Sequence, residues 1–296
     1  MKQNGAHQQG RKYLVVVADD FGRTSSVTCA VAEAHDRGIL KAASLMAGGD
    51  AFSEAVRVAH TRKGLSVGLH VTLCDGRAVL PPSRIPGLAD RDGFFEKNPS
   101  LAWVHYMKPG LLSQIVEEVD AQFSSLERAG IRPTHVDGHH HIHMHPLIFE
   151  VVCRMAWQRG VRWIRLTKES LSMVIRFRSE ERGALPFAEW AVLGVLGLYN
   201  RRIARKYGMR SPYYLYGLSG MGGIDEEYLL RMLKHMRSPL SELFTHPDEG
   251  TVQGRKEREA LTSIRVRTLM ESRGITPVGY GGLYGEDTSP SCEERW

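Results

Sequence analysis

The chain has 296 residues, of which 42% are hydrophobic and 24% are charged, with a formal net charge of +6 and a pI near 9.2. This is the composition of a folded globular protein, and it excludes an intrinsically disordered or membrane-embedded chain. Lysine and arginine are dispersed, with no basic arm and no alternation of basic and aromatic residues, so we expect no binding to nucleic acid. The length suits a single α/β barrel, which takes about 250 residues.

The N-terminal segment and the cysteines indicate where the protein resides. Residues 1–11 are polar and lack the apolar core of a secretory signal, so we expect a flexible tail before a single domain over residues 12–296. The widely spaced cysteines predict neither a disulfide framework nor a structural zinc site; they are Cys29, Cys74, Cys153 and Cys292. We therefore expect a cytoplasmic protein, and association with a membrane surface stays open.

Short apolar runs alternate with amphipathic stretches along the chain, which is the pattern of βαβ units on a parallel sheet. The expected strands cover residues 13–18, 42–46, 66–69, 134–137, 162–166, 213–216, 241–245 and 276–278. The expected helices cover residues 27–36, 53–60, 111–129, 147–158, 226–236 and 255–271. Residues 75–110 and 168–212 interrupt the alternation as insertions. Seven or eight strands of this kind predict a closed or nearly closed TIM-like (β/α) barrel.

Polar side chains stand where four of these strands end. Asp19 and Asp20 follow the first strand, His70 the third, His139 the fourth and His246 the seventh. Because the carboxyl ends of parallel barrel strands converge on one face, and that face holds the active site, we expect these side chains to lie together. One such residue would be an ordinary cap, but four strand ends with two carboxylates and several imidazoles predict a site.

Six of the thirteen histidines lie between residues 135 and 145. This density of imidazole beside Asp137 predicts one bound divalent metal ion, whereas a solvated, histidine-rich turn is the plainer alternative. One aspartate and two histidines from separate strands can hold an ion and leave positions open for water and substrate. Asp137 and His135 are candidates to orient the ligand imidazoles. The sequence assigns no definite role to the rest of the cluster, which comprises His140, His141, His143 and His145.

The paired aspartates and the distant His246 indicate catalysis rather than binding alone. Neighbouring residues on an extended backbone point opposite ways, so one aspartate is expected as a ligand and the other as a general base. His246, on a different strand, is the natural acid for a leaving amine. Two alternatives stay open: a metal-dependent phosphoester hydrolase, which would need ligands for further ions, and a metal-binding protein without turnover. Arg165 is expected to face either the substrate or the outer helices.

Four sequence blocks carry a resemblance to a known family. They are Ala-Asp-Asp-Phe-Gly at residues 18–22, Gly-Leu-His at 68–70, Thr-His-Val-Asp-Gly-His-His-His-Ile-His at 134–143 and Thr-His-Pro at 245–247. In this order, within residues 12–280, they resemble the signature blocks of the YdjC-like carbohydrate deacetylases. The resemblance implies a distorted (β/α) barrel and metal-dependent hydrolysis of the N-acetyl group of an amino sugar.

Carried over residue by residue, the resemblance makes Asp20, His70 and His139 the metal ligands, Asp19 the base and His246 the acid. Residue 138 is glycine where many members have serine, a departure that affects hydrogen bonds behind the ligands more than the ligands themselves. The family resemblance implies magnesium. One carboxylate and two imidazoles equally suit zinc, manganese, cobalt or nickel.

A narrower resemblance concerns the substrate. Residues 43–46, residues 80–86 and the tryptophan-containing insertion after residue 185 resemble the hopanoid-biosynthesis-associated branch (HpnK), whose substrate is an N-acetylglucosaminyl lipid. The apolar run 185–199, with basic residues after it, would then contact a membrane surface, whereas a buried helix is the plainer interpretation. Residue 140 is histidine where that branch often carries lysine, so a soluble chitooligosaccharide stays open as the substrate, as does a homodimer.

Overall fold

The computed structural model describes residues 11–168, 171–177, 185–220 and 222–284 of the chain. The expected tail lies outside these residues except for residue 11, and so do Cys292 and parts of the 168–212 insertion.

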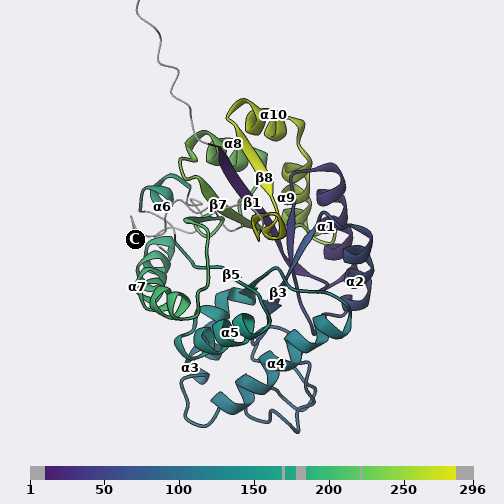
Figure 1. The fold of residues 1–296 in the computed structure, drawn as a ribbon, viewed down its shortest axis with the longest axis vertical. Helices are drawn as coiled ribbons and strands as arrows, with labels where there is room; N and C mark the ends of the chain where they lie inside the picture. The colour runs from purple at the N-terminus through teal and green to yellow at the C-terminus, as the bar shows by residue number, and fades with distance from the viewer. Residues whose placement is uncertain (1–10, 169–170, 178–184, 221, 285–296) are drawn as a thin grey trace, which may run out of the picture.

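Eight strands form one curled sheet at the centre of the molecule (Figure 1). The sheet order is β5-β4-β3-β2-β1-β7-β6, β8 pairs with β1, and all of these pairings are parallel. The strands are β1 (Lys12–Phe21), β2 (Ala42–Leu45), β3 (Ser66–Val71), β4 (His135–Gly138), β5 (Trp163–Ile164), β6 (Tyr214–Tyr216), β7 (Leu240–Thr245) and β8 (Ile275–Val278). Each falls at a position that the hydrophobic pattern predicted.

The sheet closes almost completely into a barrel. Residues 12–15 of β1 pair with β8 and residues 17–21 pair with β2, while β7 runs along its other edge. Between the two outermost strands, an isolated parallel bridge joins Trp163 to Arg210, and the Arg210 N–H donates to the Arg162 carbonyl at 2.6 Å. The expected distorted (β/α) barrel is confirmed.

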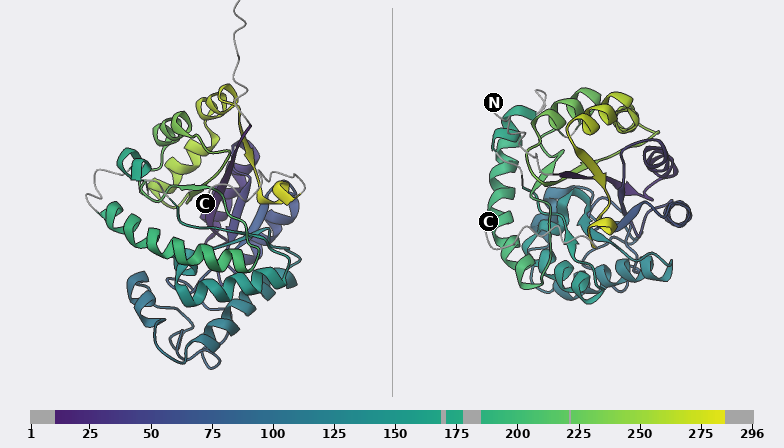
Figure 2. Two further views of the ribbon diagram at one scale, coloured as in Figure 1. Left: turned by 60° about the vertical axis from the view of Figure 1, so that its left-hand side comes forward. Right: turned by 45° about the horizontal axis from the view of Figure 1, so that its top comes forward.

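Helices surround the strands on all sides in the right-hand view of Figure 2. The α-helices are α1 (Ser25–Arg37), α2 (Phe52–Thr61), α3 (Pro99–His105), α4 (Leu112–Arg128), α5 (Pro146–Gln158), α6 (Leu171–Phe177), α7 (Leu185–Lys206), α8 (Glu226–His235), α9 (Val252–Thr262) and α10 (Ile264–Ser272). Two 3-10 segments are η1 (His139–Met144) and η3 (Tyr280–Tyr284). Within the described part of the chain, no helix is long and apolar enough to cross a bilayer.

The prediction of a single helix over residues 255–271 is wrong. The structure has two helices there, α9 and α10. Ser263 adopts an extended conformation between α9 and α10, and its hydroxyl accepts the Val266 N–H at 3.3 Å. Serine is a favourable residue at such a break, because its hydroxyl accepts a backbone N–H that has no partner within the first turn of the next helix.

The strands alternate between two environments. Leu14, Val16 and Ala18 of β1 pack against the helices, whereas Val15 and Val17 belong to a smaller cluster inside the barrel. Other members of the inner cluster are Ala42, Trp163, Leu240 and Tyr280. Because side chains alternate along a strand, the next inward positions are polar, and they include Asp19, Ser44, Asp137, Arg165 and Glu242. The barrel interior is therefore apolar at its base and polar toward the carboxyl ends of its strands.

Gly68 on β3 gives a test of this interior packing. A Cβ at that position would meet three atoms of the buried His135 ring at 2.5–2.6 Å. We expect Gly68→Ala to lower the free energy of unfolding by about 1–3 kcal/mol, as overpacking of a dense core does. Gly194→Ala on α7, where no atom lies within 4 Å of the added methyl, should be neutral or stabilising by up to about 1 kcal/mol. Urea unfolding curves measure both, and equal midpoints would contradict the expected clash.

Candidate active site

Both aspartates of β1 reach the same end of the barrel because the strand is irregular there. Ala18 pairs with Ala43, but Phe21 pairs with Leu45, so β1 contains one extra residue and forms a bulge. Within it, Asp20 has a φ of 61°, in the left-handed region that residues other than glycine rarely adopt. Neighbouring side chains were expected to point opposite ways. The bulge removes that constraint, and it lets both carboxylates approach His70.

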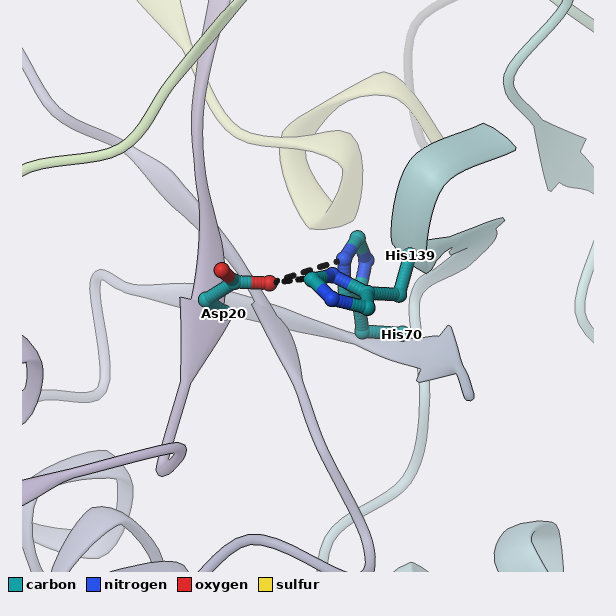
Figure 3. Close-up of side chains that lie close together, drawn as sticks. All are labelled: Asp20, His70 and His139. Atoms are coloured by element: carbon teal, nitrogen blue, oxygen red, sulfur yellow. Dashed lines mark ion pairs between the residues drawn. The ribbon is translucent and has the colours of Figure 1, made fainter. Parts of the chain in front are cut away.

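Asp20, His70 and His139 form a compact group of possible metal ligands (Figure 3). The Asp20 Oδ1 atom lies 2.8 Å from His139 Nδ1 and 3.3 Å from His70 Nε2. The same oxygen is buried, and no donor among the described residues meets it in good hydrogen-bond geometry. β1, β3 and η1 each supply one ligand. One carboxylate and two imidazoles directed at one point fit a divalent ion.

The surroundings of this group favour positive charge. Burial alone would raise the pKa of Asp20, but the facing imidazoles of His139 and His70 outweigh it and hold that pKa well below the ordinary value. Burial would likewise lower the pKa of His70, yet Asp137 and Asp19 raise it to about 10. A cation placed among these groups is stabilised by the same carboxylates.

Asp137 lies where it was expected, behind a candidate ligand. Its Oδ1 atom is 2.7 Å from His70 Nδ1, and both residues are buried, so the second ring nitrogen of His70 is fixed by a carboxylate. His135 does not take the same role. Its Nε2 lies 3.1 Å from the Ser44 hydroxyl and its ring stacks on Tyr280 with centroids 4.3 Å apart. His135 therefore contacts Ser44, whose hydroxyl donates to Asp137, and does not contact a ligand imidazole.

Arg165 occupies the middle of the polar interior and is only 1% exposed. Its Nη1 and Nη2 donate to the two oxygens of Asp19 at 2.6 and 2.8 Å, and Nη2 also lies 2.8 Å from Asp137 Oδ2. Its Nε donates to Glu242 Oε1 at 2.6 Å. Contact with substrate was one expectation for this residue. The structure instead directs its guanidinium at three buried carboxylates.

A closed ring of contacts surrounds this arginine. The Tyr280 hydroxyl donates to Glu242 Oε2 at 2.7 Å, and the Ser44 hydroxyl donates to Asp137 Oδ2 at 2.7 Å. With the stacked His135 and Tyr280 between them, these bonds join β2, β4, β7 and η3. The sequence pattern did not assign Ser44, Glu242 or Tyr280 to the site. A carboxylate at an inward position of the apolar strand β7 was the available signal.

His246 and Asp20 line one cavity of about 370 Å³ at the mouth of the barrel. His246 directly follows β7, and its backbone N–H donates to Glu257 Oε2 on α9 at 2.7 Å. Arg23, Asp248 and Gln253 line the same cavity. A ligand bound in this cavity would contact both His246 and Asp20.

The remaining histidines of the cluster have separate surroundings. The backbone of His140 and His141 is left-handed, with φ of 49° and 54°, which turns the chain sharply after His139. His143 Nε2 lies 3.1 Å from the Arg165 carbonyl, to which it donates. His145 is buried against Trp103 of α3 and precedes α5, which begins at Pro146, one residue before the predicted helix.

Comparison with known proteins covers nearly all of this architecture. The YdjC-like protein family matches residues 13–272, a range that includes every candidate site residue named above except Tyr280. The chain belongs to the YdjC-like protein family. The resemblance of the four sequence blocks is thereby confirmed at the level of the family.

Two curated relatives of this YdjC-like protein have names that describe an activity. A carbohydrate deacetylase of Brevibacillus brevis is 34% identical over 143 residues, which cover 48% of this chain and 55% of that protein. A chitooligosaccharide deacetylase of Salmonella typhimurium is 33% identical over 164 residues, 54% of this chain and 61% of that protein. The matched segments thus span little more than half of each relative.

Solved structures extend the likeness over the whole barrel. A proposed cellobiose-phosphate cleavage protein of Enterococcus faecalis has a TM-score of 0.72 and 25% identity, covering 92% of this chain and 99% of that one. A lactam utilization protein of Thermus thermophilus has a TM-score of 0.50 and 15% identity, covering 90% and 99%. The second likeness is one of fold alone.

Arg165 gives a test of the buried polar interior. Replacing it in Arg165→Met leaves three buried carboxylates without their common cation, so we expect a loss of about 3–5 kcal/mol in the free energy of unfolding. Arg84→Met is the matched control, because Arg84 forms an exposed pair with Glu117 at 2.6 Å and should change stability by less than about 1 kcal/mol. Chemical denaturation measures both, and a loss in Arg165→Met no larger than in the control would refute the structural role.

Proposed function

We propose that this protein hydrolyses the N-acetyl group of an acetylated amino sugar and releases acetate, with one divalent metal ion as cofactor. The observation that carries the proposal is the group formed by Asp20, His70 and His139, which adjoins Asp19 and whose Asp20 lines the same cavity as His246. The names of the two curated relatives support a carbohydrate as the substrate and deacetylation as the reaction.

Asp20, His70 and His139 are the residues that would hold the ion. A divalent ion bound there would supply Lewis-acid polarisation of the amide carbonyl and would make the attacking water more acidic. The ligand set suits zinc, manganese, cobalt and nickel, and the family resemblance implies magnesium.

The protein's own groups move the protons. Asp19 accepts a proton from the attacking water, and Arg165 fixes the direction of its carboxylate through two hydrogen bonds. His246 donates a proton to the amine as the bond between nitrogen and the acetyl carbon breaks. Asp137 keeps the ring of His70 in one orientation. Because these groups lie on β1, β3 and β4 or directly after β5 and β7, only the assembled barrel brings them together.

The substrate is either a soluble chitooligosaccharide or an N-acetylglucosaminyl lipid. The helices α3 and α7 both contact η1, which carries His139, and both also expose apolar side chains. On α3 these are Leu101 and Val104, and on α7 they are Val195 and Leu198, each at least 57% exposed. Exposed apolar side chains on two helices that contact η1 support the lipid arm of the proposal, and the name of the Salmonella relative supports the soluble arm.

Asp19→Asn tests the assignment of the base. The variant keeps the shape of the side chain and the three proposed ligands but loses the proton acceptor, so we expect acetate release to fall by about 10²–10⁴-fold while the ion still binds. Acetate release and calorimetric titration of the metal measure the two properties separately. Asp50→Asn, at an exposed position, is the control and should match the parent in both. Normal turnover of Asp19→Asn would show that another group is the base.

Removal of the metal tests the cofactor and the substrate together. We expect dialysis against a chelator to abolish acetate release and a divalent ion to restore it, because polarisation of the amide carbonyl depends on the ion. The restored enzyme should be assayed with N-acetylglucosamine, diacetylchitobiose and an N-acetylglucosaminyl lipid, with magnesium, manganese, cobalt, nickel and zinc in turn. Acetate release that survives chelation would contradict the metal dependence, and no release from any substrate would contradict the proposed substrate class.

A further inference from the structure

The outer ring nitrogen of His139 faces a second carboxylate that the proposed reaction does not use. His139 Nδ1 lies 2.8 Å from Asp20, whereas its Nε2 lies 3.6 Å from Asp75 Oδ2. Arg23 contacts all three residues: its Nη2 is 2.9 Å from Asp75 Oδ2, and its Nη1 is 3.2 Å from Asp20 Oδ2 and 3.3 Å from His139 Nε2. Asp75 thus faces the outer nitrogen of His139 as Asp137 faces that of His70, but at 3.6 Å rather than 2.7 Å.

The backbone holds Asp75 in place from outside the barrel strands. Asp75 follows β3 at the start of the 75–110 insertion, and its N–H donates to the Glu96 carbonyl at 2.9 Å within that insertion. Its φ of 42° lies in the left-handed region, as does that of Asp20. Such a conformation costs about 1–2 kcal/mol for a residue other than glycine, so it persists where the surrounding structure requires it.

The chemistry of imidazole gives this arrangement a purpose. A neutral histidine that uses one ring nitrogen as a metal ligand carries its hydrogen on the other, and that N–H needs an acceptor. For His70 the acceptor is Asp137, at 2.7 Å. For His139, Arg23 Nη1 lies 3.3 Å from Nε2 but can only donate, so it cannot accept a hydrogen from that nitrogen. Asp75 Oδ2, at 3.6 Å, is an acceptor just beyond hydrogen-bond distance, and a small movement of either side chain closes the bond.

We propose that Asp75 is the positioning residue of His139, as Asp137 is of His70, and that Arg23 holds the Asp75 carboxylate in place. Asp75 is 30% exposed at its side chain, so the bond from Arg23 restrains a carboxylate that water would otherwise surround. The pair couples the 75–110 insertion to the metal ligands. This inference rests on the ligand set of the proposed function, and it concerns ion binding rather than turnover.

Titration of Co²⁺ alone into the metal-free full-length protein tests the proposal by calorimetry. Loss of a carboxylate behind a histidine ligand typically costs about 10–100-fold in metal affinity, and we expect that loss for Asp75→Asn with one ion bound per chain. Asparagine tolerates the left-handed backbone, so the variant should fold, which circular dichroism checks. Asp75→Glu, which keeps the carboxylate, should recover most of the affinity. Asp90→Asn, an exposed aspartate in the same insertion, should bind as the parent does.

The role of Arg23 is tested by comparing Arg23→Gln in the parent and in the Asp75→Asn variant. If Arg23 acts by holding Asp75, its replacement changes Co²⁺ affinity by different factors in the two backgrounds. The same factor in both would overturn the coupling. Parent-like affinity of Asp75→Asn would overturn the positioning role. So would two ions per parent chain falling to one in Asp75→Asn, because Asp75, His139 and His140 would then form an ion site of their own.

The Co²⁺-binding experiment and the assay of acetate release test different proposals. A parent protein that binds Co²⁺ through Asp75-dependent geometry but releases no acetate would contradict the proposed function and leave this inference standing. Acetate release by a protein whose Co²⁺ affinity does not depend on Asp75 would do the reverse.

Discussion

The structure of the site depends on a single buried guanidinium. Arg165 pairs with Asp19, Asp137 and Glu242, which come from β1, β4 and β7, and none of these carboxylates is more than 3% exposed. Three carboxylates this close would repel one another in an apolar interior. Planar arginine, with donors in fixed directions, can bind all three at once, which the single ammonium of a lysine cannot do in the same way. The cation therefore permits a polar layer inside a barrel that is otherwise filled by apolar side chains.

Two contacts lead from this cation to the proposed chemistry. One runs directly to Asp19, and the other runs through Asp137 to His70. Burial would raise the pKa of Asp137, but Arg165 and His70 outweigh it and hold that pKa far below the ordinary value, so its carboxylate stays an acceptor for the His70 ring. The proposed base and one proposed ligand thus owe their orientation to the same residue. Disturbance of the ring around Arg165 would change both together.

The sequence alone predicted the parts of this protein that follow from periodicity. The apolar run at residues 13–18 predicted β1, and the shared direction of parallel strands predicted that Asp19, Asp20, His70, His139 and His246 lie at one end of the barrel. What it missed depends on contacts between distant residues or on local irregularity. The bulge at Asp20 has no periodic signal, and Ser263 reads as an ordinary helix residue until its hydroxyl is seen to cap α10. The partners of Arg165 and of His139 were hidden for the same reason, since Glu242 and Asp75 are far from them in sequence.

The aspartates at the end of β1 have a further consequence during synthesis of the chain. The apolar run of β1 has high β-propensity, and its partners β7 and β8 lie more than two hundred residues later in the sequence. Asp19 must wait for Arg165, 146 residues further on, before its charge is neutralised. Until then Asp19 and Asp20 act as charged gatekeepers, because unpaired carboxylates at the end of an exposed strand oppose its pairing with other chains. The two carboxylates that the proposed reaction uses thus also oppose association of this apolar strand with other chains before the barrel closes.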